Sequence, residues 1–408
     1  MQVISFSEAL TAVQQYASRL CPTEPEFVSL LDGMRLALAE DMVADRDFPP
    51  FPRATRDGYA VRAEDVASVP ARLRCIGELK AGASEAQTAI SVTPGEAVEI
   101  MTGAPVPSDA NAVVMVEYTE KNDDTVIVKR AVTRGENIVL AGSEARTGDV
   151  MVSRGTRVNH IAVAIAAAVG RPEIAVYRRP RVAVLATGDE LVDISLAPGP
   201  NEIRNSNSYS LAAQVYDAGG EALILPVARD DAADLDVLIR KGAECDLLLL
   251  SGGVSMGKYD LVEQALGKLG ATFFFTGVLI QPGKPLVFGE LRGANRATPF
   301  FGLPGNPAST MVTFQLFVRP VLDALAGARQ QALLFAQARL KAEFHVKPGL
   351  TRFLPARLYG THEQPEVELM KWQGSGDLMA QAQSNCYLVV PPDKEHYKAG
   401  ENITVLPF

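Results

Sequence analysis

Three loops in the middle of the chain combine glycine with hydroxyl and acidic residues, and each follows a short apolar run. They are TGDE at 187–190, SGGVSMGKYD at 251–260 and LPGNP at 303–307. Glycine permits positive φ and a close backbone approach, so successive N–H groups can form an anion-binding concavity. Asp189, Glu190 and Asp260 tolerate a nearby phosphate only with a cation such as Mg²⁺ between them. Each loop alone is more often an ordinary turn, but the three together predict a metal–phosphate pocket.

The elements around these loops indicate how they are positioned. Apolar runs such as RVAVLAT, EALILPVA and CDLLLLSGG alternate with helix-length amphipathic stretches between residues 179 and 327. That alternation is typical of βαβ units and predicts a parallel sheet covered on both faces. Ligands of such sheets bind at the carboxyl ends of the strands, where the three loops begin. The sequence therefore predicts a phosphate-binding α/β domain.

Other candidate residues carry weaker signals. Asp230 follows the run ALILPVA, where it either joins the pocket or caps a helix. Lys284 lies in the rigid turn QPGKP, where it either meets an anion or is simply solvated. The stiff loops DGY at 57–59 and TGAPVP at 102–107 place a carboxylate and a hydroxyl in the N-terminal half. The histidines are scattered, so the sequence suggests no His-based triad or zinc site; they are His160, His345, His362 and His396.

Composition narrows the class of protein. The 408 residues are 47% hydrophobic and 21% charged, which suits a globular chain of several domains. A net charge of −9 without a basic run argues against nucleic acid as a partner. The four cysteines have no CxxC spacing, and no apolar run is long enough to span a bilayer. A reducing cytoplasm is the expected location.

The remaining segments predict further helices and β domains. Ser5 and Glu8 have capping-box spacing, which predicts an N-terminal helix, and a second apolar-periodic stretch runs from about 27 to 42. Prolines at 49, 50 and 52 force an extended segment. Short β runs predict small β domains near 71–140 and 330–408. The helix expected at 160–169 is apolar nearly all round, which favours a core helix and leaves a subunit interface as the alternative.

Six motifs occur in one order along the chain: RDGYAVRAED, IMTGAPVPSDANAVVMVE, LATGDEL, LLSGGVSMGKYD, QPGKPLVFG and GLPGNPAS. In these motifs the chain closely resembles the molybdopterin molybdenumtransferases, the family that includes the E domain of gephyrin. The resemblance implies a multidomain α/β plus β fold. Its parts would be an elongated N-terminal domain (1–45 with 141–178), an inserted β-rich domain (46–140), a molybdopterin-binding α/β domain (179–327) and a C-terminal β barrel (328–408).

The resemblance also implies a reaction and its participants. Molybdenum from molybdate would be inserted into adenylated molybdopterin, with Mg²⁺-dependent release of AMP. The protein would be a homodimer in which the partner's N-terminal motifs complete the site of the α/β domain. Other molybdenum cofactor biosynthesis proteins would be further partners, and neither nucleic acid nor a membrane would take part.

Roles follow motif by motif from the same resemblance. The implied catalytic residues are Asp57, Thr102, Glu190, Asp230 and Asp260. The implied metal ligands are Glu144, Glu190, Asp230 and Asp260. The implied substrate-binding residues are Thr187, Gly188, Asp189, Ser251, Gly252, Gly253, Ser255, Lys284, Pro304, Gly305, Asn306, Pro307, Arg352 and Ser375.

The chain departs from the family pattern at four places. PRATR at 52–56 stands where the family commonly has DNSAM, and Ser143-Glu144 replaces Glu-Asp. Gln281 replaces the first lysine of a Lys-Pro-Gly-Lys motif, and Pro355 falls where the family has an arginine. The last two changes remove cations from the expected oxyanion end, so weaker molybdate handling is expected.

Two alternatives to the transferase stay open from the sequence. One is a molybdopterin-binding or scaffold protein that keeps the pocket without turnover. The other is a molybdopterin adenylyltransferase, which needs only the central module. The N-terminal and C-terminal motifs favour the transferase over the adenylyltransferase, and the set of acidic motif residues favours it over the scaffold.

Overall fold

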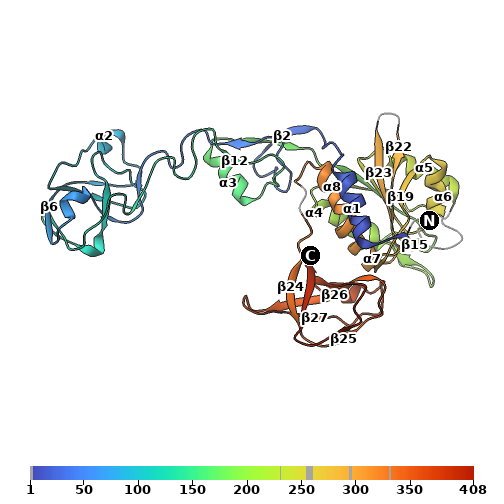
Figure 1. Ribbon diagram of the computed structural model, residues 1–408. Coiled ribbons are helices and arrows are strands. Elements are labelled where there is room, and N and C mark those ends of the chain that lie inside the picture. Colours follow the sequence, from blue (N-terminus) through green and yellow to red (C-terminus); the bar gives the residue numbers. More distant parts are fainter. Residues whose placement is uncertain (1–2, 230, 254–260, 294–295, 330–331) are drawn as a thin grey trace. The chain divides into compact units, whose positions relative to one another are not determined.

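The computed structural model describes residues 3–229, 231–253, 261–293, 296–329 and 332–408 (Figure 1). Their contacts divide the chain into two compact units. The first comprises Met1–Glu40, Gly155–Asn159 and Glu173–Phe408, and the second comprises Asp41–Arg154 and His160–Pro172. The first unit holds an α/β sheet and a C-terminal barrel, and the second holds a separate β sheet.

The α/β sheet has the strand order β17-β14-β18-β23-β22-β19. The strands are β14 (Arg181–Ala186), β17 (Glu221–Ile224), β18 (Leu247–Ser251), β19 (Thr272–Phe275), β22 (Val287–Arg292) and β23 (Ala297–Leu303). The first four in the order run parallel, as predicted. Strand β22 runs antiparallel to both of its neighbours, β23 and β19. Its connection to β23 is short, and a parallel crossover needs a longer one.

Helices cover both faces of this sheet, which confirms the prediction from the apolar runs. Alternate residues of β18 face opposite cores: Leu247 and Leu249 pack on one side, and Leu248 and Leu250 on the other. The first core also takes residues of α1 (Phe6–Ala17), α4 (Ser206–Asp217), α7 (Pro307–Thr313), the π-helical turn Phe314–Val318 and α8 (Arg319–Leu325). The second takes residues of α5 (Ala232–Gly242) and α6 (Leu261–Lys268).

The N-terminal helix begins at the predicted capping box. The Ser5 N–H donates to Glu8 Oε2 at 2.8 Å, and the Glu8 N–H donates to Ser5 Oγ at 3.3 Å. Ala9, Val13 and Ala17 of α1 are buried in the core of the α/β sheet. The predicted domains grouped this segment with 141–178, whereas its packing places it on the α/β sheet, because its apolar face finds a partner surface there.

The stretch from 27 to 42 forms no helix. Its first residues belong to β2 (Pro25–Ser29), which pairs antiparallel with β13 (Glu173–Tyr177), and turns follow. The side chain of Phe27 is 71% exposed and that of Leu31 is 74% exposed. The helical interpretation was wrong because pairing with a distant strand overrode the local periodicity.

The second unit contains the β-rich domain that the sequence predicts. Its sheet has the order β8-β5-β7-β6-β10-β9. The strands are β5 (Gly58–Val61), β6 (Ala71–Leu79), β7 (Glu96–Ile100), β8 (Ala112–Met115), β9 (Thr119–Asn122) and β10 (Thr125–Val128).

Helix α3 (His160–Ala168) of this unit departs from the favoured interpretation. Its buried residues are only Ala162 and Ala166, and Ile161 is 57% exposed. A core helix would bury such side chains all round, so that interpretation is wrong for the single chain. The apolar surface of α3 stays uncovered within its own unit.

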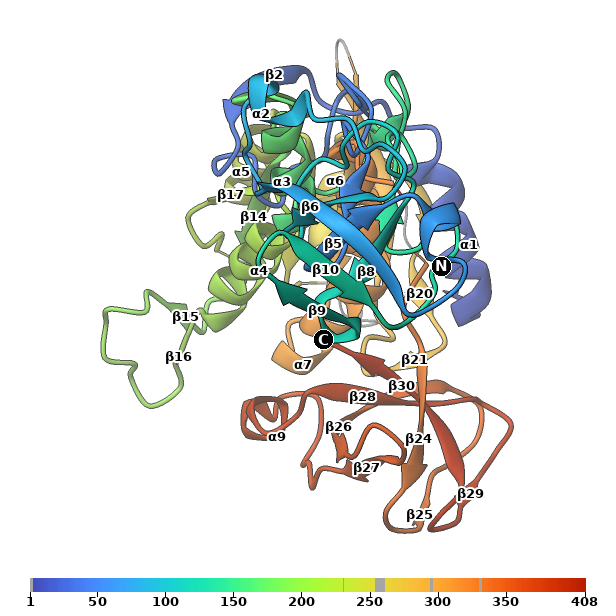
Figure 2. The same ribbon diagram turned by 90° about the vertical axis from the view of Figure 1, so that its left-hand side faces the viewer.

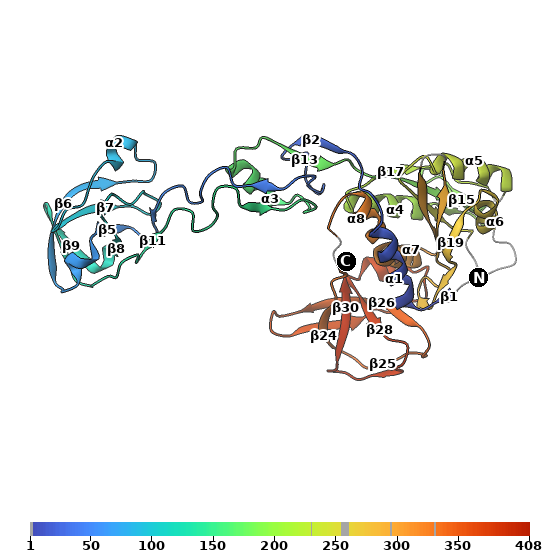
Figure 3. The same ribbon diagram turned by 45° about the horizontal axis from the view of Figure 1, so that its top comes forward.

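The C-terminal segment forms a closed barrel, visible below the α/β domain in Figure 3. Five strands close it through the pairing of β26 with β28: β24 (Ala336–Leu340), β26 (Thr351–Gly360), β27 (Pro365–Leu369), β28 (Cys386–Val390) and β30 (Asn402–Pro407). The short strand β21 (Ile280–Gln281) of the α/β domain adds in parallel to β26. This pairing joins the barrel to the α/β domain.

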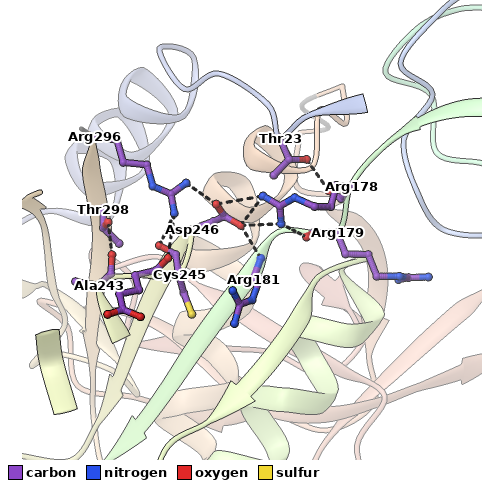
Figure 4. Close-up of polar contacts among 10 residues, drawn as sticks. Thr23, Arg178, Arg179, Arg181, Ala243, Cys245, Asp246, Arg296 and Thr298 are labelled. Atoms are coloured by element: carbon purple, nitrogen blue, oxygen red, sulfur yellow. Dashed lines mark hydrogen bonds and ion pairs between the residues drawn. The ribbon is translucent and has the colours of Figure 1, made fainter. Parts of the chain in front are cut away.

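The amino edge of the α/β sheet is held by a buried carboxylate (Figure 4). Asp246, just before β18, is 4% exposed. It accepts hydrogen bonds from Arg178 at 3.2 Å, from the Arg181 N–H at 2.8 Å and from Arg296. Burial alone would raise the pKa of Asp246, but the hydrogen bonds from Arg296, Arg181 and Arg178 outweigh it and hold that pKa below its usual range.

Candidate functional site

At the opposite, carboxyl edge the three predicted loops come together. The strand register aligns Ala186 with Ser251 and Ser251 with Leu303, so the loops leave the sheet side by side. The Thr187 N–H donates to Ser251 O at 3.1 Å, and the Gly252 N–H donates to Leu303 O at 3.3 Å. The parallel sheet therefore positions the loops as the sequence predicts.

These loops surround a pocket. Gly252 has φ of +92°, and a Cβ there would lie 2.4 Å from Thr187 O. Only glycine allows this approach of the second loop to the first. The pocket is lined by Ala186, Thr187, Glu190, Leu191, Ile203, Arg204, Asn205, Ser206, Asn207, Ser251, Gly252, Gly305 and Pro307. Gly188, Asp189, Gly253, Pro304 and Asn306 lie in the same loops.

Asn207, in the first turn of α4, forms hydrogen bonds with the second and the third loop. Its Nδ2 donates to Gly305 O at 2.6 Å and to Ser251 Oγ at 3.0 Å. Because Gly305 O can only accept, the orientation of the amide is fixed. Among the described residues, Asn207 Oδ1 is buried without a hydrogen-bond partner. Asn207 thus connects α4 to the loops after β18 and β23.

Two helices begin at the pocket. Asn205 caps α4 by accepting from the Ser208 N–H at 3.2 Å. Helix α7 begins at Pro307, and the Ala308 N–H donates to Ser375 O of the C-terminal segment at 3.0 Å. This N–H in the first turn of α7 is therefore already occupied by a hydrogen bond within the chain. The same bond places Ser375 beside the third loop, and its assignment to the substrate stays a prediction.

The predicted cations lie at different places from the pocket lining. Lys284 is exposed, in a loop whose Gly283 approaches Thr313 of α7. Arg352 is 8% exposed, pairs across β21–β26 with Gln281 and donates to Leu350 O at 3.2 Å. Among the described lining residues the cation is instead Arg204, whose Nε donates to Leu196 O at 2.9 Å.

The predicted metal ligands are only partly described. Glu190 lines the pocket, whereas Asp230, Ser255 and Asp260 lie outside the described residues. Glu144 belongs to the second unit and pairs with Arg53 at 2.8 Å. Within the described ranges, no group of three His, Cys, Asp or Glu side chains is arranged to hold a metal ion. The metal assignments stay predictions.

The other two predicted catalytic residues contact each other in the second unit. Asp57 Oδ1 accepts from the Thr102 N–H and from Thr102 Oγ1, each at 2.7 Å. These hydrogen bonds lower the pKa of Asp57, so the carboxylate is charged at neutral pH. The two motifs DGY and TGAPVP therefore form one local feature.

Three family patterns match successive parts of the chain. Residues 4–170 match the MoeA N-terminal region (domain I and II), residues 183–324 match a probable molybdopterin binding domain, and residues 337–408 match the MoeA C-terminal region (domain IV). The molybdopterin molybdenumtransferase of Nostoc sp. is 35% identical over 94% of this chain and 88% of its own. That of Bacillus subtilis is 33% identical over 94% of this chain and 90% of its own.

The chain belongs to the molybdopterin molybdenumtransferase family. Solved structures agree with this membership. The molybdopterin biosynthesis MoeA protein of Pyrococcus horikoshii OT3 is 30% identical and has a TM-score of 0.81, with both chains fully covered. A second structure from the same species is 32% identical, with a TM-score of 0.74. The multidomain α/β plus β fold is thereby confirmed. No helix among the described residues is long and apolar enough to cross a membrane.

The sequence interpretation of this family member missed the four polar pocket residues that precede and begin α4. Arg204, Asn205, Ser206 and Asn207 line the pocket, although the stretch RNSN carries neither glycine nor a carboxylate. Figure 2 shows the loop that leads to them, with β15 (Leu191–Val192) and β16 (Ile203–Arg204) at its base. Two asparagines at the start of an amphipathic helix were the available signal, since a single N-cap explains only one of them.

Proposed function

We propose that this member of the molybdopterin molybdenumtransferase family inserts molybdenum from molybdate into adenylated molybdopterin and releases AMP at the carboxyl-edge pocket. The observation that carries the proposal is the convergence of the three loops on one pocket. The alternative of an adenylyltransferase needs only the central module, whereas this chain also matches the N-terminal and C-terminal regions of the family. The place of the reaction in molybdenum cofactor biosynthesis follows from family membership.

The pocket supplies groups that suit a phosphoanhydride. Cleavage of that bond leaves additional negative charge on phosphate oxygens. Arg204 contributes a positive charge to the pocket, and the amino end of α4 contributes a partial positive charge. Both stabilise the negative charge that develops on the phosphate oxygens. Asn207 holds the loops so that these groups keep their positions when the anhydride breaks.

The donor atoms at the pocket fit Mg²⁺. Glu190 provides carboxylate oxygens and Ser251 a hydroxyl oxygen, and oxygen ligands are those that Mg²⁺ prefers. We assign the ion to Glu190 together with Asp230 and Asp260. When bound, Mg²⁺ would supply charge neutralisation at the phosphate oxygens. Lys284, Arg352 and Ser375 are assigned to molybdate or phosphate oxygens.

The proposal includes a cytoplasmic homodimer with shared sites. Asp57 and Thr102 of one subunit would complete the pocket of the other. The uncovered apolar surface of α3 supports a dimer, because exposed apolar patches mark protein contacts. In the first unit, Phe27 of β2 and the nearby Leu31 are also exposed apolar side chains, which a subunit contact would cover.

One assay tests the reaction. Purified protein is incubated with adenylated molybdopterin, Mg²⁺ and molybdate, and both AMP and metallated cofactor are measured. The proposal expects the two products in equal amounts, with loss of both when EDTA removes Mg²⁺. Tight binding without AMP release would instead support the scaffold alternative. Pyrophosphate release from ATP and molybdopterin would support the adenylyltransferase.

A second experiment tests the shared site. Chains carrying Asp57→Ala and chains carrying Glu190→Ala are each expected to be inactive alone. Co-expression restores one intact site in each mixed dimer. In that site, the unaltered pocket of the Asp57→Ala chain is completed by the unaltered N-terminal motif of the Glu190→Ala chain. Random assortment predicts roughly a quarter of wild-type activity. Activity of the mixture no higher than that of the separate variants would contradict the shared site.

A further inference from the structure

The C-terminal segment brings together two histidines that lie far apart in the sequence. His345 in β25 (Phe344–His345) is the cross-strand partner of His396 in β29 (His396–Tyr397), and Figure 2 labels both strands. The ring centroids lie 4.1 Å apart with planes inclined by 4°. The Val346 N–H donates to Glu395 O at 2.9 Å, so the histidines form the adjacent non-hydrogen-bonded pair. Side chains approach most closely at such pairs.

A carboxylate lies beside the two imidazoles. Glu343 precedes His345 by two residues, and its Oε2 lies 3.5 Å from His396 Nε2. That nitrogen is buried and makes no hydrogen bond with any described residue. The nearby cation Lys394 is engaged elsewhere, with Glu401 and over the ring of Tyr397. The arrangement leaves an unsatisfied nitrogen between a second imidazole and a carboxylate.

The neighbouring cross-strand pair anchors β25 and β29 on the barrel. Phe344 and Tyr397 stack with centroids 4.9 Å apart and planes inclined by 5°. Tyr397 is 3% exposed and belongs to the core of the barrel, against which Phe344 packs. His345, in contrast, is exposed, and exposed side chains change rotamer within nanoseconds. One ligand is therefore free to turn while its strand stays in place.

We propose that Glu343, His345 and His396 bind a divalent transition-metal ion of the Zn²⁺, Ni²⁺ or Cu²⁺ class. Two imidazoles and one carboxylate suit these ions, whereas Mg²⁺ prefers oxygen ligands alone. The stacked rings do not yet point their nitrogens at one centre, in keeping with the lack of a ready three-ligand group in the described chain. Binding would require His345 to turn so that one of its ring nitrogens joins His396 Nε2 and Glu343, with Zn–N distances of about 2.0–2.1 Å expected.

Such an ion would cross-link β25 and β29, whose pairing comprises only two residues of each strand. β25 and β29 form a two-stranded sheet of their own, outside the closed barrel. An ion that binds these two strands only when they are paired raises the stability of the pairing. This site uses no residue of the carboxyl-edge pocket, so its test does not depend on the proposed reaction.

The test is a calorimetric titration of the metal-stripped full-length protein with ZnCl₂, repeated with NiCl₂ and MgCl₂. Wild-type protein is expected to bind Zn²⁺ and Ni²⁺ at this site, with a rise in melting temperature that His345→Ala loses, whereas any effect of Mg²⁺ should be the same in wild type and in His345→Ala. His345→Ala and His396→Ala should each weaken Zn²⁺ binding about tenfold or more, since loss even of outer partners of metal ligands has effects of that size. Glu343→Gln should weaken it less.

His362→Ala is the matched control, because His362 lies in the same segment with its side chain 91% exposed. This variant should keep wild-type affinity. Wild-type affinity in both His345→Ala and His396→Ala would overturn the site. Equal losses in the control would do the same, since they would point to unspecific surface binding. Far-UV circular dichroism of the exposed-position variant His345→Ala separates loss of a ligand from loss of fold.

Discussion

The two edges of the α/β sheet differ in how their buried polar groups are hydrogen-bonded. At the amino edge, Asp246 is buried and receives hydrogen bonds from two arginines and a backbone N–H. At the carboxyl edge, glycines open the backbone, and the buried Oδ1 of Asn207 has no partner among the described residues. Both edges contain buried polar groups. Among the described residues, those of the amino edge have hydrogen-bond partners, whereas Asn207 Oδ1 at the carboxyl edge has none.

This difference separates stability from binding. A carboxylate satisfied by its own chain fixes the fold and leaves little for a ligand to gain. Loops held by a few hydrogen bonds around a pocket keep donors available for a substrate. Substitutions at the amino edge are therefore expected to change the free energy of unfolding, and those at the carboxyl edge to change binding and turnover.

Among substitutions that compare the two edges, and apart from the assigned catalytic and metal-binding residues, Gly252→Ala is expected to have the largest effect. The added Cβ would meet Thr187 O at 2.4 Å, so the second loop must move away from the first. A displacement of about 1 Å in a reacting geometry lowers turnover about 100-fold. Steady-state AMP release measures this. Gly349→Ala is the control, because Gly349 also has positive φ but open space around it. Equal losses in the two variants would mean that φ strain alone matters.

Asp246→Ala should act on stability instead. Removing one partner of a buried ion pair costs about 3–5 kcal/mol, but Arg178 and Arg296 are 38% and 52% exposed, which reduces the loss to about 2 kcal/mol. Urea unfolding measures it, and substrate affinity should stay close to wild type. The control Asp236→Ala breaks an exposed pair with Arg240 and should change the unfolding free energy by less than about 0.5 kcal/mol.

Asn207→Ala should weaken substrate binding about tenfold and lower the unfolding free energy by less than about 2 kcal/mol. It removes the hydrogen bonds to Gly305 O and Ser251 Oγ, each worth about 1 kcal/mol. It also removes the unpartnered Oδ1, which offsets part of the loss in stability. Calorimetric titration with adenylated molybdopterin checks the affinity. A loss of stability without a loss of affinity would place Asn207 with the amino edge.

The smallest effect is a pH dependence at the amino edge. The pKa of Asp246 is depressed in the folded protein, so its contribution to stability is complete above the unfolded value of about 3.9. The contribution is lost as pH falls below that value and through the folded pKa. The unfolding free energy of wild type should therefore decline between pH 4 and pH 3 more steeply than that of Asp246→Asn. Parallel curves would show that Asp246 does not titrate there.

The carboxyl edge was largely predictable from the sequence, and the amino edge was not. The loops at the carboxyl ends of parallel strands lie at the same edge of a sheet, so the segments TGDE, SGG and LPGNP predict the pocket from the sequence. Arg178, Asp246 and Arg296 lie far apart in the chain and carry no local motif, so only the fold reveals their contact. Asn207 was missed for a related reason, since its partners Ser251 and Gly305 belong to other loops.

Local signals also failed where tertiary contacts decided the outcome. The capping box of Ser5 and Glu8 predicted α1 correctly but not the surface on which it packs. His345 and His396 looked scattered because antiparallel pairing, which brings them together, has no trace in their sequence positions. The apolar run of α3 favoured burial, but the described part of the chain leaves Ile161 57% exposed.

The most direct test of the contrast between the edges is hydrogen–deuterium exchange with and without adenylated molybdopterin. The account predicts slower exchange in peptides spanning 185–192, 204–208, 251–253 and 303–308, with no change at 178–181, 243–247 and 296–298. Protection confined to the amino-edge peptides, or equal at both edges, would contradict the assignment of the carboxyl edge as the substrate site.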